Sequence, residues 1–185
     1  MATIVQKENP VLRRKAERVP ISLITSPKIK RLIASMQEAV NKEEDGVAIA
    51  ACQIGVPVAI FIVSGRAFDI VEGNSDSKSH SPLVCINPEI LKESKKKQWV
   101  DEGCLSVRWL YGKVKRNIKL TIKAYDEKGK RFTRGASGLI AQIFQHEMDH
   151  LEGKLFTDKA KEVREIPPLS AAPNKKSEKV TVKSV

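Results

Sequence analysis

Apolar residues recur with helical spacing in two parts of the chain. The first stripe follows Ser26 and predicts an amphipathic helix that begins at Pro27 and ends by Gly46. Its apolar positions are Ile29, Leu32, Ile33, Met36 and Val40. The second stripe predicts a semi-buried helix of about four turns that ends at Gly153. Its apolar positions are Leu139, Ile140, Ile143, Phe144 and Leu151.

Four segments between these helices have the β-branched or alternating pattern of strands, namely 57–63, 83–90, 96–106 and 114–125. Glu127-Lys128-Gly129 predicts a turn into a further short strand. Residues 65–82 are rich in Gly, Ser, Asn and Asp and predict a surface loop with an exposed, inert His80. This order of elements predicts an α+β fold, with antiparallel strands packed around a central helix.

The central helix carries His146-Glu147-Met148-Asp149-His150. Residues four apart on a helix lie one above the other, about 6 Å along the axis, so two imidazoles can bind one divalent cation. Glu147 can then reach a coordinated water without being a ligand. The metal acidifies the water and the carboxylate accepts its proton, which is hydrolytic chemistry. The alternative is a pair of structural histidines, and it leaves Glu147 unexplained.

A catalytic metal site normally has three protein ligands, so a third donor is expected. Where metzincin proteases have a third histidine, this chain has Phe156. Glu162 and Glu165 are conceivable ligands, but little chain remains there to build a second ligand-bearing helix. Cys104 is the better candidate, because it lies between strand-like segments and Gly103 permits close backbone approach beside it. A metal-dependent amidase or peptidase therefore remains only the runner-up.

The small residues from Gly46 to Gln53 indicate a place where another backbone lies close. Gln53 stands among apolar neighbours and needs a hydrogen-bond partner, which a substrate carbonyl could provide. The alternative is a tightly packed buried strand after a glycine-terminated helix. The remaining cysteines, Cys52 and Cys85, lie in apolar runs and are interpreted as small core residues.

Together these three segments resemble the peptide deformylase family. The family motifs are Gly-x-Gly-x-Ala-Ala-x-Gln, Glu-Gly-Cys-x-Ser and Gln-His-Glu-x-Asp-His. Here they read Gly46 to Gln53, Glu102 to Ser106 and Gln145 to His150, in the same order. The resemblance implies a metal-dependent hydrolase that removes the N-formyl group from the formyl-methionine of nascent polypeptides and releases formate.

The resemblance also implies a metal centre and a catalytic carboxylate. Cys104, His146 and His150 would hold one divalent metal ion, Fe2+ in cells, with Ni2+, Co2+ or Zn2+ able to take its place. Glu147 would act as general base and then as the general acid that protonates the departing amine.

Five further positions receive roles from the same resemblance. Gln53 and the backbone N–H of Leu105 would stabilise the oxyanion. Gly46, Val47 and Gly103 would bind the substrate, whose backbone would lie beside Val47 and Gly103 as an added strand.

The chain departs from the family pattern in two places. The second glycine of the first motif is Ala48, a small change if its φ is negative and a serious one if φ is positive. After Ser106 the family commonly continues with a proline and then an arginine, whereas this chain has Val107 to Gly112. These departures leave substrate preference open and keep a catalytically silent peptide- or RNA-binding relative as an alternative.

Composition fits one soluble catalytic domain, residues 1–165, in a chain of 185 residues with 41% hydrophobic residues. No apolar run reaches the roughly 18–20 residues of a membrane helix, and the N-terminus lacks an apolar signal core. Three cysteines favour a reducing cytoplasm, so we expect a cytoplasmic protein. We also expect a monomer that has no membrane partner.

The chain carries a net charge of +11, and its last segment, residues 166–185, is basic and rich in proline. We expect this tail to be disordered. It is either a functionless solvated end or an attachment to the ribosome surface near the exit tunnel, where RNA would attract the positive charge.

Overall fold

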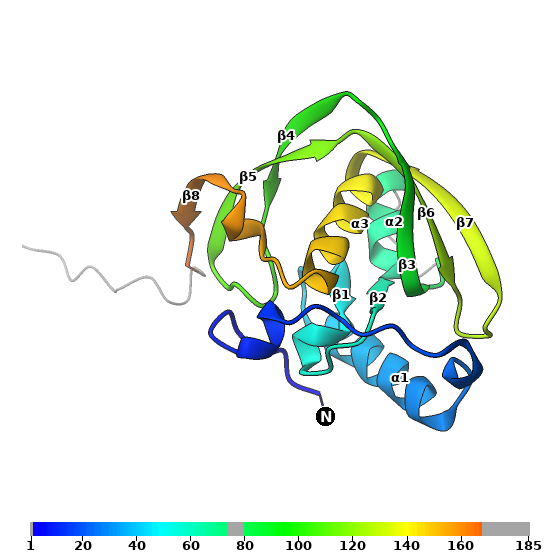
Figure 1. Cartoon of the computed structure of the whole chain (residues 1–185). Helices are drawn as coiled ribbons and strands as arrows, with labels where there is room; N and C mark the ends of the chain where they lie inside the picture. Colours follow the sequence, from blue (N-terminus) through cyan, green and yellow to red (C-terminus); the bar gives the residue numbers. More distant parts are fainter. Residues whose placement is uncertain (1, 74–79, 168–185) are drawn as a thin grey trace, which may run out of the picture.

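The structure is a computed structural model that describes residues 2–73 and 80–167 (Figure 1). Its helices are α1 (Pro27–Lys42), α2 (Gly65–Glu72) and α3 (Gly138–Leu151), with short 3-10 turns at Pro10–Arg13, Ile21–Leu23, Ala51–Ile54 and Phe156–Asp158. Its strands are β1 (Ala48–Ala50), β2 (Ile60–Val63), β3 (Leu83–Glu93), β4 (Lys97–Glu102), β5 (Leu110–Asn117), β6 (Lys119–Tyr125), β7 (Arg131–Ser137) and β8 (Lys161–Glu165). Apart from residues 166 and 167, the expected tail lies outside the described residues.

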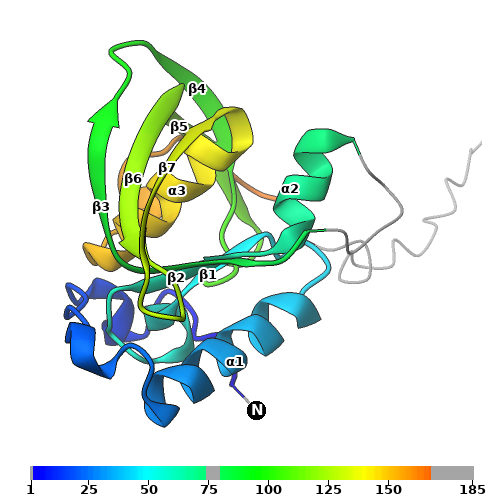
Figure 2. The same cartoon turned by 90° about the vertical axis from the view of Figure 1, so that its right-hand side faces the viewer.

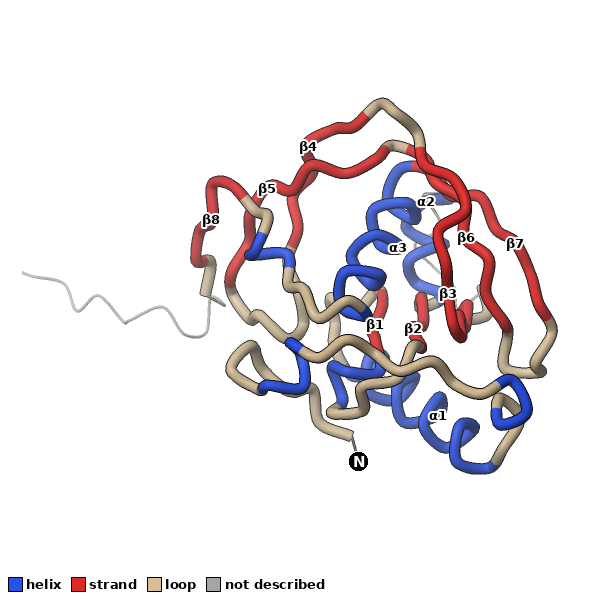
Figure 3. Tube along the Cα trace, in the orientation of Figure 1, coloured by secondary structure: helices blue, strands red, loops and turns tan. Residues whose placement is uncertain are grey.

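The strands form two antiparallel sheets, one of five strands in the order β1-β2-β3-β6-β7 and one of three in the order β4-β5-β8. Figure 3 shows the strands curving around α3, which contacts β1, β2, β5, β6 and β7. The predicted α+β fold with antiparallel strands is confirmed. The sequence of α3 includes the His-Glu-x-x-His motif. No helix in the described ranges is long and apolar enough to cross a membrane.

The core has two parts that meet at β2. Every residue of β2 is buried, and successive side chains of a strand point to opposite faces. Phe61 and Val63 pack into the cluster around α3, whereas Ile60 and Ile62 pack into the cluster beneath α1. Figure 2 shows α1 and α3 on opposite sides of β1 and β2. β2 is therefore buried on both faces and separates the two clusters.

The prediction of a surface loop over 65–82 was wrong for its first part, because residues 65–72 form α2. Ser64 caps this helix by accepting a hydrogen bond from the Arg66 amide, and Gly73 ends it with φ +72°. A serine before and a glycine after an apolar stretch were the overlooked signals. The prediction of an exposed His80 was also wrong, because its side chain is only 33% exposed and its Nδ1 lies 2.7 Å from Oδ1 of Asp69.

The single strand predicted over 114–125 is in fact two strands in different sheets. β5 ends at Asn117 and β6 begins at Lys119. The side-chain amide of Gln145 on α3 accepts from the Asn117 N–H at 2.9 Å and donates to its carbonyl at 3.0 Å. This contact occupies the backbone N–H and carbonyl of Asn117. The pairing of β5 in one sheet therefore ends here, and β6 begins in the other sheet. The exposed strand β8 was not predicted, because its charged sequence has no alternating apolar pattern.

Candidate active site

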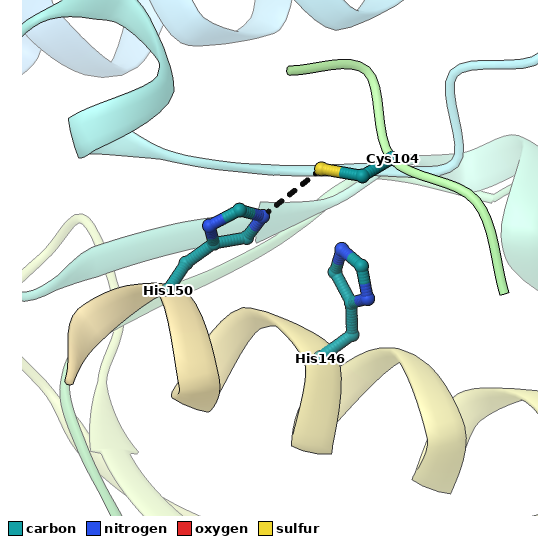
Figure 4. Close-up of side chains that lie close together, drawn as sticks. All are labelled: Cys104, His146 and His150. Atoms are coloured by element: carbon teal, nitrogen blue, oxygen red, sulfur yellow. Dashed lines mark hydrogen bonds between the residues drawn. The ribbon is translucent and has the colours of Figure 1, made fainter. Parts of the chain in front are cut away.

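Three side chains from two distant segments converge at one point. Cys104 follows the end of β4, and His146 and His150 lie on consecutive turns of α3 (Figure 4). Their ligand atoms all lie within 4.8 Å of one another, and Cys104 Sγ lies 3.2 Å from His150 Nε2. A thiolate and two imidazoles bind zinc-like ions at about 2.0–2.3 Å, so these donors fit around a single divalent ion.

His146 is oriented by a buried carboxylate. Its Nδ1 lies 3.0 Å from Oε2 of Glu102, which leaves Nε2 as the nitrogen available to a metal. Burial alone would raise the pKa of Glu102, but hydrogen bonds from Arg116 and His146 outweigh it and hold the pKa at about 2. Glu102 is therefore an anion at neutral pH, and it keeps His146 in one orientation.

Arg116 extends this contact into a network that sequence reasoning missed. Its Nη1 donates to Oδ2 of Asp149 at 2.6 Å, and Lys159 donates to the other oxygen of Asp149 at 2.6 Å. Arg116 is buried on the α3 side of β5, next to Val114 on the same face. A charged residue at an inward-facing strand position was the available signal, because buried charges need partners.

Glu147 lies on the same helix and lines the cleft beside the three donors. Only 3% of this residue is exposed, and its Oε2 has no hydrogen-bond partner among the described residues. Burial raises the pKa of Glu147 to about 7, although the positive charge of His146 opposes the shift. A carboxylate in this state can accept and return a proton near neutral pH.

Gln53 points its donor end towards the three converging side chains. It is 2% exposed, and its Oε1 accepts from the Ala50 N–H at 2.8 Å. Its Nε2 donates to Ser106 Oγ at 3.2 Å and lies 3.6 Å from Cys104 Sγ. The backbone N–H of Leu105 has no acceptor among the described residues, whereas the Leu105 carbonyl accepts from Gln6. Two donors are thus available beside Cys104.

The cleft has a volume of about 270 Å³, and one of its walls is formed by Val47 and Ala48. The Val47 carbonyl accepts from the Ser64 N–H at 2.8 Å, so the alternation of the strand points the backbone groups of Ala48 to the open edge. β1 is the edge strand of its sheet and can pair with an added strand. Ala48 is not among the residues with positive φ, so its methyl group causes no backbone strain.

Two of the expected substrate-binding residues are glycines for packing reasons. Gly46 is buried and is not part of the cleft lining, and a Cβ there would lie 2.3 Å from the Val40 carbonyl oxygen. Gly103 lines the cleft opposite β1, and a Cβ there would lie 2.7 Å from the ring of Tyr111. Their expected contacts with substrate stay predictions.

The altered segment after Ser106 forms the other wall of the cleft. Arg108 forms an ion pair with Asp45 at 2.8 Å and another with Glu43, both in the loop after α1. Its guanidinium also lies 5.6 Å from the ring centre of Trp109, a non-glycine residue with φ +66°. These contacts join the two walls of the cleft at one end.

The remaining candidates do not add a ligand to the three converging side chains. Cys52 and Cys85 are fully buried, as expected for core residues, and burial raises the pKa of Cys52 to about 12. Glu162 is exposed and pairs with Lys113, and Glu165 is exposed. Phe156 stacks its ring on His146 with centroids 6.3 Å apart. A third ligand downstream of α3 is therefore not supported.

Comparison with known proteins gives a consistent result. The sequence model of the polypeptide deformylase family matches residues 1–165. Peptide deformylase of Desulforudis audaxviator is 38% identical over 157 residues, which cover 85% of this chain and 92% of that protein. Peptide deformylase 1A of Arabidopsis thaliana, named as chloroplastic and mitochondrial, is 38% identical over 162 residues, 84% of this chain and 60% of that protein.

Solved structures agree with the sequence relatives. The peptide deformylase of Thermotoga maritima superposes with a TM-score of 0.74 at 29% identity, over 87% of this chain and 98% of that one. The peptide deformylase of Synechococcus elongatus gives a TM-score of 0.73 at 30% identity, over 86% of this chain and 79% of that one. The chain belongs to the polypeptide deformylase family, hydrolytic enzymes that are metal-dependent and remove the N-formyl group from nascent polypeptides.

Proposed function

We propose that this chain hydrolyses the formyl amide of N-formylmethionyl peptides within the cleft between β1 and the segment after β4. The observation that carries this proposal is the convergence of Cys104, His146 and His150 beside a buried carboxylate oxygen of Glu147 that finds no hydrogen-bond partner in the described part of the chain. The products are formate and a peptide with a free amino terminus.

Cys104, His146 and His150 are the residues that would hold one divalent metal ion. The donor set fits, because one thiol group and two imidazoles lie within reach of one ion, and three protein ligands would leave a position for water in a catalytic site. A divalent metal supplies Lewis-acid activation of water and of a carbonyl oxygen when it is bound. We propose Fe2+ in cells, with Ni2+, Co2+ or Zn2+ as possible replacements, because metal availability usually decides which ion occupies such a site.

Glu147 moves the proton in this proposal. Its carboxylate accepts a proton from the attacking water and then transfers it to the nitrogen of the departing amine as the C–N bond breaks. Its position supports this role, because the carboxylate lines the cleft beside the three donors and its Oε2 has no hydrogen-bond partner among the described residues. The general base and the general acid are thus the same residue.

Gln53 Nε2 and the Leu105 N–H stabilise the negative charge that develops on the formyl oxygen. The Ala50 amide holds Oε1 of Gln53, so the NH2 end faces Cys104. The substrate backbone lies in the cleft as an added strand between the edge of β1 at Val47 and Ala48 and the opposite wall at Gly103. A formyl carbon carries only hydrogen, so a small site admits it and excludes an acetyl group.

The test is the release of free amine from formyl-Met-Ala-Ser by protein purified without oxygen. Acetyl-Met-Ala-Ser and an internal peptide are the controls. Cleavage of the formyl peptide alone supports the proposal. Cleavage of the internal peptide would favour a peptidase, and binding of one metal per chain without any cleavage would favour a silent relative.

We further propose that the catalytic domain comprises residues 1–165 and that the basic tail, 166–185, brings the cleft near the ribosome. Supporting observations are the net charge of +11 and the hydrogen bond from the Ile166 N–H to the Trp109 carbonyl at 2.8 Å. This bond places the start of the tail beside the cleft. Truncation after Pro167 should weaken co-sedimentation with ribosomes, and sedimentation unchanged by truncation removes the tail from this account. A cytoplasmic location and a monomeric state stay predictions.

A further inference from the structure

The three-stranded sheet has an outer face that the deformylase chemistry does not use. Along β4 and β5, residues alternate between the side of α3, which holds Glu102 and Arg116, and the opposite side. Figure 1 shows β4, β5 and β8 at the margin of the molecule, far from α1. We call the opposite side the Trp99 face, formed by Lys97, Trp99, Lys113, Lys115 and Lys161. The same face carries Asp101, which pairs with Arg164 at 3.0 Å.

An exposed indole lies at the centre of the Trp99 face. Trp99 is 46% exposed, and the ammonium groups of Lys115 and Lys161 lie 6.0 and 5.1 Å from its ring centre. Lys115 is the cross-strand partner of Trp99, and Lys161 on β8 pairs with Lys113. The three strands therefore bring one aromatic surface and several cations together from distant parts of the sequence.

Most of the positive charge on the Trp99 face is uncompensated. Lys97, Lys115 and Lys161 have no carboxylate within 4 Å among the described residues, whereas Lys113 pairs with Glu162 at 2.7 Å. A single exposed lysine is common on protein surfaces and by itself indicates no binding site. Two lysines at the ring of an exposed indole, with Lys97 on the same face, form a surface suited to a ligand that is both polyanionic and aromatic.

We propose that the Trp99 face binds single-stranded RNA, with one base stacked on Trp99 and the neighbouring phosphates contacted by Lys97, Lys115 and Lys161. Unpaired bases stack on exposed aromatic side chains, and flexible lysines pair with the backbone phosphates. An acidic peptide would use the lysines but has no need of the indole. A membrane surface would require more apolar area than one exposed ring.

This binding is independent of the proposed deformylase reaction, because the Trp99 face lies on the reverse of the sheet from Glu102. The test uses the full chain and a fluorescein-labelled oligouridylate of about 12 nucleotides, followed by fluorescence anisotropy. We expect Trp99→Ala to raise the dissociation constant at least about fivefold, because one stacking contact is lost. Turnover of formyl-Met-Ala-Ser should be unchanged, which also shows that the variant is folded.

The contribution of the lysines is separated from net charge by a matched pair of variants. The logarithm of the binding constant falls linearly with the logarithm of the salt concentration, with a slope of about 0.7 for each phosphate contacted on a single strand. The double variant Lys115→Ala, Lys161→Ala removes two such contacts and should therefore reduce this slope by about 1.4. Lys28→Ala with Lys30→Ala removes the same charge from exposed positions on α1 and should leave the binding nearly unchanged.

Three results would overturn the proposal. Equal binding by wild type and Trp99→Ala would exclude stacking. Equal weakening by the two lysine pairs would mean adsorption through net charge alone. Competition by polyglutamate or by vesicles of phosphatidylserine as strong as that by unlabelled oligouridylate would show that the face is not selective for RNA.

Discussion

Arg116 of β5 and Glu102 of β4 lie on the same face of their sheet and form a buried, two-bonded ion pair. Arg116 Nε donates to Oε1 at 2.7 Å and Nη2 donates to Oε2 at 2.9 Å, while Oε2 also contacts His146. The parallel geometry is the strong form of this interaction, and both side chains are nearly removed from solvent. The pair therefore fixes the position of Glu102, which in turn orients His146, one of the proposed metal ligands.

Removal of Glu102 tests this support. Glu102→Ala leaves Arg116 buried with only Asp149 as a partner, and we expect a loss of about 3 kcal/mol in the free energy of unfolding. Urea denaturation measures the loss, and metal affinity should fall about 10- to 100-fold. Asp101→Ala, which breaks the exposed pair with Arg164, is the matched control and should cost under about 1 kcal/mol. Similar losses in both variants would contradict the support that we assign to the buried pair.

Glu147→Gln separates proton transfer from metal binding. The amide has nearly the same shape but cannot accept the proton, so kcat should fall by roughly 10²- to 10⁴-fold. Metal content, measured by atomic absorption, should stay at the wild-type level. The control is Glu152→Gln, near the end of the same helix. The native Glu152 pairs with Lys15 on the surface, so this variant should leave kcat unchanged. Wild-type turnover by Glu147→Gln would refute the assigned role.

Gln53→Ala tests the oxyanion donor. Loss of one such donor typically lowers kcat by about 10²- to 10³-fold, and formyl-peptide turnover measures it. Gln145→Ala also removes a buried amide, the one that holds the Asn117 backbone, and should reduce stability without this loss of kcat. If the two variants lose kcat equally at matched folded fraction, Gln53 has only a structural role.

Cys104→Ala should abolish binding of the metal, because the thiolate is one of three donors that meet at the site. Cobalt content after dialysis against Co2+ is the readout. Cys85→Ala is the control, since Cys85 is buried within β3 and its thiol is kept protonated by burial, which raises its pKa. Full metal content in Cys104→Ala would show that the two histidines bind with a different third ligand.

His80 should make the stability of the chain depend on pH. A hydrogen bond to Asp69 raises the pKa of His80 above its usual value near 6.5, although partial burial opposes the shift. Protonated His80 therefore adds stability that is fully present below about pH 6.5 and is lost as the pH rises through the raised pKa. Melting temperatures from about pH 5 to about pH 9 should show this step in wild type, and a step that persists in His80→Gln would assign it to another group.

Local features of the sequence were sufficient for the elements that carry the chemistry. The spacing of His146 and His150 places them on one face of any helix, and the apolar stripe around them is enough to predict that helix. Ser26 before Pro27 likewise marks the start of α1, where its hydroxyl accepts from the Ile29 amide. These predictions succeed because they depend on interactions between residues a few positions apart.

The missed features depend on contacts across the fold. Gln145 divides one apparent strand into β5 and β6, and Arg116 is explained only by Glu102 and Asp149, which lie on other elements. β8 exists only because β5 offers it an edge.

The sequence by itself determined the two helices, the order of the motifs and the residue types that could bind a metal, because periodicity and capping act locally along the chain. Only the tertiary structure decided that Cys104 Sγ lies 3.2 Å from His150 Nε2, that Oε2 of Glu147 is buried without a hydrogen-bond partner among the described residues, and that lysines from two strands gather around Trp99. Distances between segments follow from how two sheets pack around one helix, and no local pattern contains that information.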